Sequence, residues 1–312
     1  MSGLRRLTWR TVVVGAAALA LVLSAVAGGA VALASVPGAV MVLSQLDQGA
    51  GEEARETLTP VLRVVSYNIR HGRGMDDLVD LPRTAGVLER LEPEVVALQE
   101  VDDRAQRSGE VAQAQKLGLL LDMHWAFGKF MDFQGGGYGM ATLSRHPMVR
   151  QEALRLPDGN EPRVALVTEV ELPGGERVLV VNIHFDWVRD DEYRFAQASR
   201  LARYLDEVEI PWILVGDLND QPGSRTWELF HSRALEARKP EGDRFTFPST
   251  DPQREIDFIF AAPAARWEVG RVEVIHEPMA SDHRPVLAEL RLLPDPQQLA
   301  PPPPWVRRTL TF

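Results

Sequence analysis

The chain of 312 residues contains no cysteine. Disulfide bonds, thiolate metal sites, cysteine nucleophiles and lipid anchors on cysteine are therefore excluded, so the folded part must be held together by its apolar core. An excess of basic residues is missing too, because the formal net charge is −10. An acidic chain lacks the positive surface expected of a tight, sequence-independent nucleic-acid binder, although local basic patches are compatible with this charge.

Charge is absent altogether from residues 11–44, a mostly apolar run. This run exceeds both the roughly 20 residues that cross a bilayer and the roughly 7 to 15 residues of a signal-peptide core, which favours a membrane anchor. Residues 1–10 contain three arginines and no acid, so this basic segment is expected to stay in the cytoplasm while the rest of the chain lies outside it. A cleaved signal segment, and thus a secreted protein, is the alternative, because residues 25–27 and 32–34 resemble cleavage sites.

Two further segments flank the part of the chain that has the composition of a folded domain. Residues 45–60 are polar, acidic and poor in aromatic residues, which predicts a linker. Residues 294–312 include four consecutive prolines, so we expect a stiff, extended tail. The folded domain is thereby predicted at residues 61–293. Residues 1–50 carry three arginines and one aspartate, so the rest of the chain has a net charge of −12.

Within the predicted domain, short apolar runs alternate with helical patterns. Strands are predicted at residues 61–69, 94–99, 138–144, 163–172, 177–185, 211–218, 256–262 and 285–293, and helices at residues 81–92, 104–121 and 190–208. The strands on either side of Gly174-Gly175 read as a hairpin, whereas residues 94–99 and 211–218 are continuous apolar runs that indicate strands buried on both faces. The fold class is therefore α/β with a mixed sheet or sheets.

Polar side chains gather at the ends of these predicted strands. They are Asn68, Glu100, His184, Asp217 and Asn219 after apolar runs, and Asp282 and His283 before one. Strand ends that meet at one edge of a sheet are where α/β proteins place their sites. Carboxylates are the ligands that Mg²⁺ prefers, and amide and imidazole groups can stabilise charge on phosphoryl oxygens. The pattern therefore predicts a divalent-metal phosphoesterase.

Each of these residues also has an ordinary structural explanation. A glutamate such as Glu100 often begins a helix, and Asn68 and Asn219 are common turn formers. For His184, the ordinary explanation is a hydrogen-bonded histidine in the core. His71 is followed by Gly72 and Gly74, which favours a turn over a contact with phosphate. Only their joint occurrence in this order favours a site.

The local context of these residues resembles the successive signature segments of a known superfamily. Those segments are VVSYNIRHGRG, VVALQEVD, YGMATLSRHP, VNIHFD, ILVGDLND, FTFPSTDPQREIDFIF and SDHRPV. They resemble the endonuclease/exonuclease/phosphatase superfamily, which has the DNase I-like fold, and the likeness runs from about residue 62 to residue 292. The resemblance implies an α/β fold that is a four-layer sandwich, in which two mixed β-sheets pack face to face with helices outside.

The resemblance also implies a metal centre. Glu100 matches the principal metal carboxylate of a Mg²⁺ or Mn²⁺ ion, with Asn68 beside it and Asp282 as a possible further ligand. One position departs from the pattern, because some nuclease members carry an acidic ligand where this chain has Arg70. The metal is therefore expected to depend more on Glu100 and Asp282.

The remaining site residues are assigned to the attack of water on phosphate. Asp217 matches the group that orients or deprotonates the water, and Asn219 matches a donor to the phosphate. Because residues two apart on an extended segment face the same way, we expect these two side chains to reach one phosphate together. His283 resembles the histidine that binds the scissile phosphate or acts in acid–base catalysis, Asp257 the carboxylate that orients it, and His184 a second phosphate donor.

These observations favour an exported or membrane-anchored phosphodiesterase, expected to be a monomer, that acts on a lipid headgroup or a small phosphate ester. An extracellular nuclease is the alternative, and a binding module without turnover is the alternative from another class. Three aromatic residues, Trp187, Trp227 and Phe133, are candidates for contact with an acyl chain or a base, although such residues more often fill the core or the rim of a site.

Overall fold

The computed structural model describes residues 61–295. The predicted basic segment 1–10, the anchor or signal segment 11–44, the linker 45–60 and nearly all of the tail lie outside the described residues. Among residues 61–295, no helix has both the length and the apolar character needed to cross a membrane.

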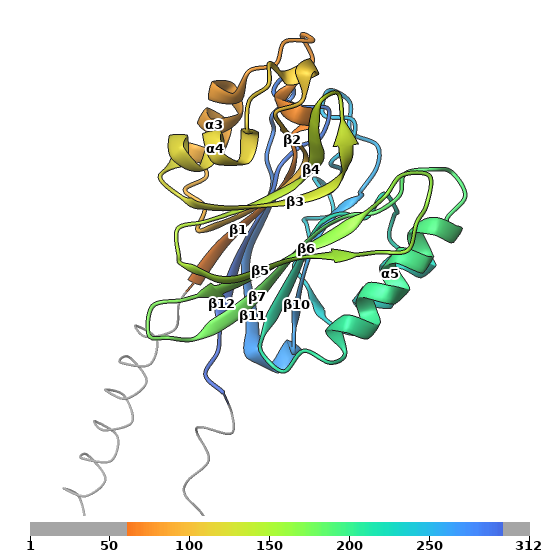
Figure 1. Ribbon diagram of the computed structural model, residues 1–312. Helices are drawn as coiled ribbons and strands as arrows, with labels where there is room; N and C mark the ends of the chain where they lie inside the picture. Colours follow the sequence, from red (N-terminus) through yellow and green to blue (C-terminus); the bar gives the residue numbers. More distant parts are fainter. Residues whose placement is uncertain (1–60, 296–312) are drawn as a thin grey trace, which may run out of the picture. The chain divides into compact units, whose positions relative to one another are not determined.

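Two mixed sheets of six strands each form the centre of the domain (Figure 1). The first sheet has the order β11 (Trp267–Val274), β12 (Val286–Leu292), β1 (Val61–Asn68), β2 (Val95–Asp103), β4 (Gly136–Ser144), β3 (His124–Phe133). The second has the order β5 (Met148–Arg155), β6 (Val164–Glu171), β7 (Arg177–His184), β8 (Trp212–Asp217), β10 (Asp257–Ala262), β9 (Leu235–Glu236). Strands β1 and β2, and likewise β7 and β8, are parallel, and the other neighbours are antiparallel.

Helices cover the outer faces of both sheets and complete the predicted four layers (Figure 1). They are α3 (Leu81–Glu89) and α4 (Gln113–Leu121) on the first sheet, and α5 (Glu192–Leu205) and α6 (Arg225–His231) on the second. Short 3₁₀ segments, η1 (Arg70–Gly72), η2 (Gln106–Ser108) and η3 (Ala264–Arg266), lie in the connections. Helix α3 begins where the Asp80 side chain accepts the N–H of Arg83, as an N-cap residue does.

One polar link crosses the layer between the sheets, which is lined mainly by apolar side chains. Buried valines and leucines of β1, β2 and β12 pack there on valines and isoleucines of β7, β8 and β10. At the link, Asn182 of β7 donates to the carbonyls of Leu98 and Ala141 at 3.0 and 2.8 Å, and accepts from the Gln99 amide at 2.7 Å. Because buried polar groups are costly unless paired, this link fixes how the two sheets register against each other.

All eight predicted strands are present, but the helix predicted at residues 104–121 is wrong over its first half. Residues 104–112 do not form the first half of a helix, because the chain turns at Gly109 with φ of +76° and α4 begins only at Gln113. One strand also begins two residues earlier than predicted. Strand β4 already begins at Gly136, so only a tight turn separates it from β3.

Candidate active site

Six of the eight predicted site residues line one cavity of about 350 Å³. They are Glu100, His184, Asp217, Asn219, Asp282 and His283. Strand register explains part of this convergence, because Asp217 at the end of β8 pairs with His184 on one side and with Asp257 on the other. The remaining two residues, Asn68 and Asp257, lie behind the cavity wall and are hydrogen bonded to residues that line it.

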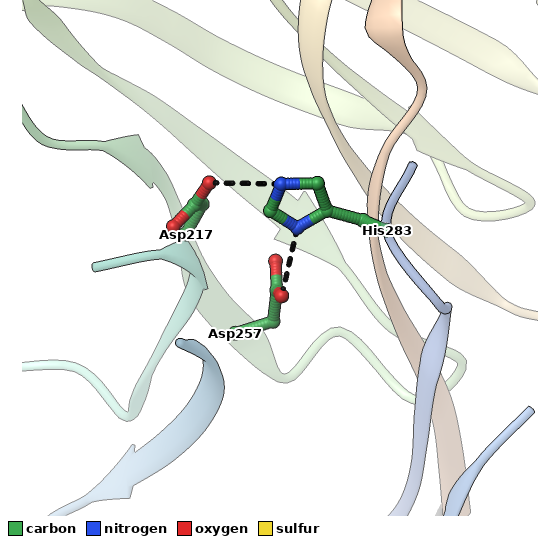
Figure 2. Close-up of side chains that lie close together, drawn as sticks. All are labelled: Asp217, Asp257 and His283. Carbon is green, nitrogen blue, oxygen red and sulfur yellow. Dashed lines mark hydrogen bonds and ion pairs between the residues drawn. The ribbon is translucent and has the colours of Figure 1, made fainter. Parts of the chain in front are cut away.

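The His283 imidazole lies between two carboxylates, as Figure 2 shows. Its Nδ1 is 3.0 Å from Asp257 Oδ2, and its Nε2 is 3.7 Å from Asp217 Oδ2. Asp257 is itself fixed, because the Thr246 hydroxyl donates to the same oxygen. Burial of His283 opposes its positive charge, but the negative charges of Asp257 and Asp217 prevail and raise its pKa to about 10. His283 is thus a cation at neutral pH and offers a proton on the side of Asp217.

Asp217 is the central carboxylate of the cavity wall. Its Oδ2 lies 3.6 Å from His184 Nε2 and accepts from the Asn68 amide at 3.3 Å. Burial and the negative charge of Asp257 raise the pKa of Asp217 to about 7. A carboxylate whose pKa is close to neutrality is suited to accept a proton from water.

His184 is held as a neutral donor by a buried arginine. Arg163 is only 1% exposed, and its guanidinium donates to His184 Nδ1 at 3.1 Å and to Glu161 at 2.9 Å. Since Nδ1 accepts this hydrogen bond, the ring proton must be on Nε2, which faces Asp217. Burial and the Arg163 charge hold the pKa of His184 well below its usual value.

The predicted arrangement of Asp217 and Asn219 on one extended segment is wrong. Strand β8 ends at Asp217, and Asn219 has φ of 53°, in the left-handed region that asparagine tolerates. The Asp217 side chain accepts the backbone N–H of Asn219 at 2.7 Å, so a turn, and not strand alternation, brings both side chains to the cavity. Asp220 follows this turn, and its carboxylate accepts from Arg194 Nε at 3.1 Å.

The chain matches the endonuclease/exonuclease/phosphatase family over residues 65–283, which is more than half of its length. It belongs to this family. None of the curated proteins compared with the chain is significantly similar to it.

Solved structures of other proteins share the fold. A family protein from Beutenbergia cavernae is 25% identical with a TM-score of 0.60, and the match covers 75% of this chain and 72% of that one. A family protein from Bacteroides vulgatus is 23% identical with a TM-score of 0.63, covering 75% and 99%. A mannosyl-6-phosphatase from Bacteroides thetaiotaomicron is 20% identical with a TM-score of 0.61, covering 73% and 99%.

Members of the endonuclease/exonuclease/phosphatase family typically use a divalent metal ion, and the residues present fit one. Glu100 and Asp282 face the same cavity, and burial together with the Asp282 charge raises the pKa of Glu100. Two carboxylates that repel each other are stabilised by a cation between them. Asn68 orients this side of the cavity, since its amide donates to Glu100 at 3.1 Å. Arg70, at the departure from the family pattern, lies 3.7 Å from Asp282.

A second group of possible ligand atoms belongs to Asp217, Asp257 and His283, which lie within 4.8 Å of one another. Two of these three are already hydrogen bonded to each other, so the group is better suited to proton transfer than to holding an ion. His71 does not line the cavity; it is a buried turn residue, as the glycines that follow it at positions 72 and 74 predict.

Sequence reasoning missed several residues of the cavity wall, chiefly Arg163, Glu161, Tyr138 and Arg254. None of the four follows an apolar run, which is the position that identified most of the other residues, although Arg163 and Tyr138 begin predicted strands. The position of Arg163 in the predicted hairpin could have identified it as a site residue. In the predicted hairpin closed at Gly174-Gly175, the start of one strand lies beside the end of the other, which places residue 163 next to His184.

Proposed function

We propose that the protein is an exported or membrane-anchored, divalent-metal-dependent phosphoesterase that hydrolyses phosphodiesters by attack of water. The observation that carries this proposal is the joint presence, in one cavity of about 350 Å³, of a carboxylate pair suited to a cation and of the Asp217–His283–Asp257 cluster. An ion-pair network with a purely structural role would need no such cavity. Hydrolysis of a phosphate ester, in contrast, needs both the carboxylate pair and the cluster within reach of the phosphoryl group.

Glu100 and Asp282, with Asn68 beside them, would hold the Mg²⁺ or Mn²⁺ ion. When bound, the ion would offset the negative charge that develops on the phosphoryl oxygens.

The protein's own groups divide the remaining work between binding and proton transfer. His283 carries a positive charge and would donate to a phosphoryl oxygen or to the leaving group, while Asp257 fixes its ring orientation. Neutral His184 would donate its Nε2–H to a second oxygen, and the buried Arg163 adds positive potential behind it. Asp217, which faces both imidazoles, would orient and deprotonate the attacking water.

We infer that the substrate is a lipid headgroup or a small phosphate ester. The net charge of −12 outside the first 50 residues supports this, because a polyanion such as DNA would be repelled at long range. An extracellular nuclease is the second candidate, and the exposed Arg254 at the cavity, whose guanidinium lies 4.5 Å from the Phe247 ring centre, favours it locally.

The proposal of an anchor at residues 11–44 agrees with where the chain enters the domain. Val61 begins β1 and pairs with Arg291, whereas the site lies at the other end of β1, after Asn68. Eight residues of strand separate these points by about 25 Å. A tether at Val61 would therefore leave the cavity unobstructed. Carbonate extraction of membranes checks this: we expect the full-length protein in the membrane pellet, and its release into the soluble fraction would contradict the anchor.

The experiment that tests the activity measures hydrolysis by the full-length protein of bis-p-nitrophenyl phosphate, p-nitrophenyl phosphate, sphingomyelin and plasmid DNA. Each substrate is assayed with Mg²⁺, with Mn²⁺ and with EDTA. We expect turnover of a diester that EDTA abolishes and that falls at least about 100-fold in Glu100→Gln and in His283→Asn. The matched controls are Glu110→Gln and His276→Asn, which change exposed residues outside the cavity.

Two results would overturn the proposal. Turnover that survives both EDTA and the Glu100→Gln change would exclude the metal-dependent mechanism. A folded protein that hydrolyses none of the four substrates would favour a binding module. Preference for plasmid DNA, with a rate that falls steeply as NaCl is added, would select the nuclease instead.

A further inference from the structure

Trp187 is a large aromatic residue that the fold leaves exposed at the catalytic cavity. Its side chain is 58% exposed and lines the cavity together with Glu161 and Arg254. Single exposed apolar residues are common on protein surfaces and need no explanation by themselves. Trp187 differs from an ordinary surface residue in how firmly its backbone is held.

The peptide units on both sides of Trp187 are fixed by buried polar side chains. Arg194, which is 6% exposed, donates to the carbonyls of Asp186 and Val188 at 3.0 and 2.8 Å. The fully buried Asp186 carboxylate accepts the N–H of Val188 at 3.2 Å. The segment is therefore clamped one residue before and one residue after the exposed indole.

This clamp is itself anchored in the rest of the fold. Gln197 of α5 accepts the N–H of Asp186 at 2.9 Å, and Asp220, after β8, accepts from Arg194 at 3.1 Å. The second oxygen of the Asp186 carboxylate accepts the N–H of Asn160 at 2.7 Å, which ties in the loop before β6. Three segments that are distant in sequence therefore fix the backbone around Trp187, whose indole ring is exposed at the cavity.

Such an arrangement is suited to binding a flat ring. Because the backbone around Trp187 is ordered before any ligand arrives, little conformational entropy is lost when a ring stacks on the indole. Aromatic side chains stack on nucleobases, which all have a π-face, and the same apolar surface can cover the flat face of a pyranose. Among residues 61–295, the side chain that donates to the Glu161 carboxylate is Arg163, which binds Oε2, so Oε1 is available to a hydroxyl or amino group.

We propose that Trp187 is a specificity-determining residue: it stacks on a ring, nucleobase or pyranose, that is carried by the phosphate ester. This inference rests on the proposed function for the position of the phosphate. It goes beyond that function by specifying that part of the substrate next to the phosphate is cyclic with an apolar face.

Binding measurements test the subsite separately from turnover. Adenosine 5′-monophosphate, glucose 6-phosphate and glycerol 3-phosphate are titrated by calorimetry into the full-length protein in an Asp217→Asn background, which lacks the proposed proton acceptor but keeps the proposed metal ligands, with Mg²⁺ present. The first two ligands carry a ring and the third does not, while all three carry the same phosphate. The variants are Trp187→Ala and Trp187→Phe. The matched control is Trp125→Ala, because Trp125 is 42% exposed but does not line the cavity.

We expect at least one ring-bearing ligand to bind more tightly than glycerol 3-phosphate. Trp187→Ala is expected to weaken that ligand about 5-fold or more, since stacking on an aromatic side chain contributes at least that factor per base. The same change should alter glycerol 3-phosphate binding less than about twofold and leave the unfolding temperature unchanged. Trp187→Phe should retain most of the affinity, and Trp125→Ala all of it. If Trp187→Ala weakens binding of the nucleotide, the ring is a nucleobase; if it weakens binding of the hexose phosphate, the ring is a pyranose.

Other results overturn the inference. If no ring-bearing ligand binds more tightly than glycerol 3-phosphate, or if Trp187→Ala weakens all three equally, the subsite does not exist. These results can be told apart from a failure of the proposed enzymatic function. Hydrolysis without ring preference would refute the subsite alone, whereas ring-dependent binding in a protein that hydrolyses no ester would refute the enzymatic function alone.

Discussion

His71 offers a direct test of how burial controls the pH dependence of stability. The side chain is only 8% exposed, and its Nδ1 is buried without a hydrogen-bond partner among the described residues. Burial, followed by the positive charge of Arg107, lowers the pKa of His71 to about 4. Arg70 and Arg73 act in the same direction, and only Asp102 opposes them. His71 is therefore neutral in the folded protein over most of the pH range.

The size of the effect follows from the two pKa values. The ordinary value of 6.5 applies to the unfolded chain and the value of about 4 to the folded one. Because the folded pKa is lower, between pH 6.5 and pH 4 the unfolded chain binds a proton that the folded chain does not. The free energy of unfolding therefore falls as the pH decreases through this window. The expected loss is about 3 kcal/mol at pH 4, from about 1.4 kcal/mol per pKa unit.

The assay compares urea unfolding of the wild-type protein and the His71→Asn variant from pH 7.5 to pH 4. Asparagine does not titrate, and it tolerates the φ of 47° found at this position. All other groups titrate in both proteins, so the difference between the two unfolding free energies isolates His71. We expect this difference to change by about 3 kcal/mol across the window. A difference that stays constant to within about 0.5 kcal/mol, as expected for the exposed control His276→Asn, would refute the reasoning.

Three further predictions concern the site and the core. Arg163→Gln should lower kcat about 100-fold on any substrate, since His184 loses the donor that fixes its tautomer; steady-state kinetics with an unchanged unfolding temperature would verify this. Gly139→Ala should lower the free energy of unfolding in urea by about 3 kcal/mol or more, because the new Cβ would lie 2.0 Å from a backbone oxygen of β3. The control is Gly242→Ala, where a Cβ would meet open space, and it should lower this free energy by less than about 0.5 kcal/mol. Asn182→Ala should also cost about 3 kcal/mol, because it removes three buried hydrogen bonds to the facing sheet; a loss below about 1 kcal/mol would contradict that role.

The strands that sequence reasoning found and those that it missed differ in one physical respect. The four missed strands, β3, β5, β9 and β11, are the four edges of the two sheets. Edge strands face solvent along one side and carry charged residues that discourage pairing with other chains. In β5, for example, Arg150 and Glu152 pair with each other on the surface. Their apolar signal is correspondingly weak, whereas the central strands are continuous apolar runs.

Long-range contacts also explain the helix that was predicted too long. Residues 104–121 are rich in helix-forming residues, but Arg107 turns back and binds Asp102 through two hydrogen bonds of 2.9 and 2.8 Å. Asp102 is fully buried, so its charge has to be paired. The left-handed turn at Gly109 makes this return possible. A tertiary ion pair therefore overrides the local propensity for a helix.

At the site, too, tertiary contacts override the backbone conformation that the local sequence favours. Strand ends identified which residues converge, but they did not predict how the side chains are aimed. Glu100 has φ of 56° and lies where the pairing of β2 with β4 shifts register, between Leu98 and Val101. Such a bulge changes the direction of a side chain that regular alternation would point elsewhere. Asn219 likewise reaches the cavity from a left-handed turn.

Left-handed backbone at a residue other than glycine costs on the order of 1 kcal/mol or more, and it persists only where surrounding contacts impose it. At Asn219 those contacts are the Asp217 carboxylate and the Phe185 carbonyl, which accepts the Asn219 amide at 3.0 Å. At Glu100 the contact is the Asn68 amide. Propensity alone would choose a relaxed backbone at both positions. The residues that sequence patterns identify most readily in this chain are thus the ones whose conformation those patterns predict least well, because their geometry serves the cavity and not the strand.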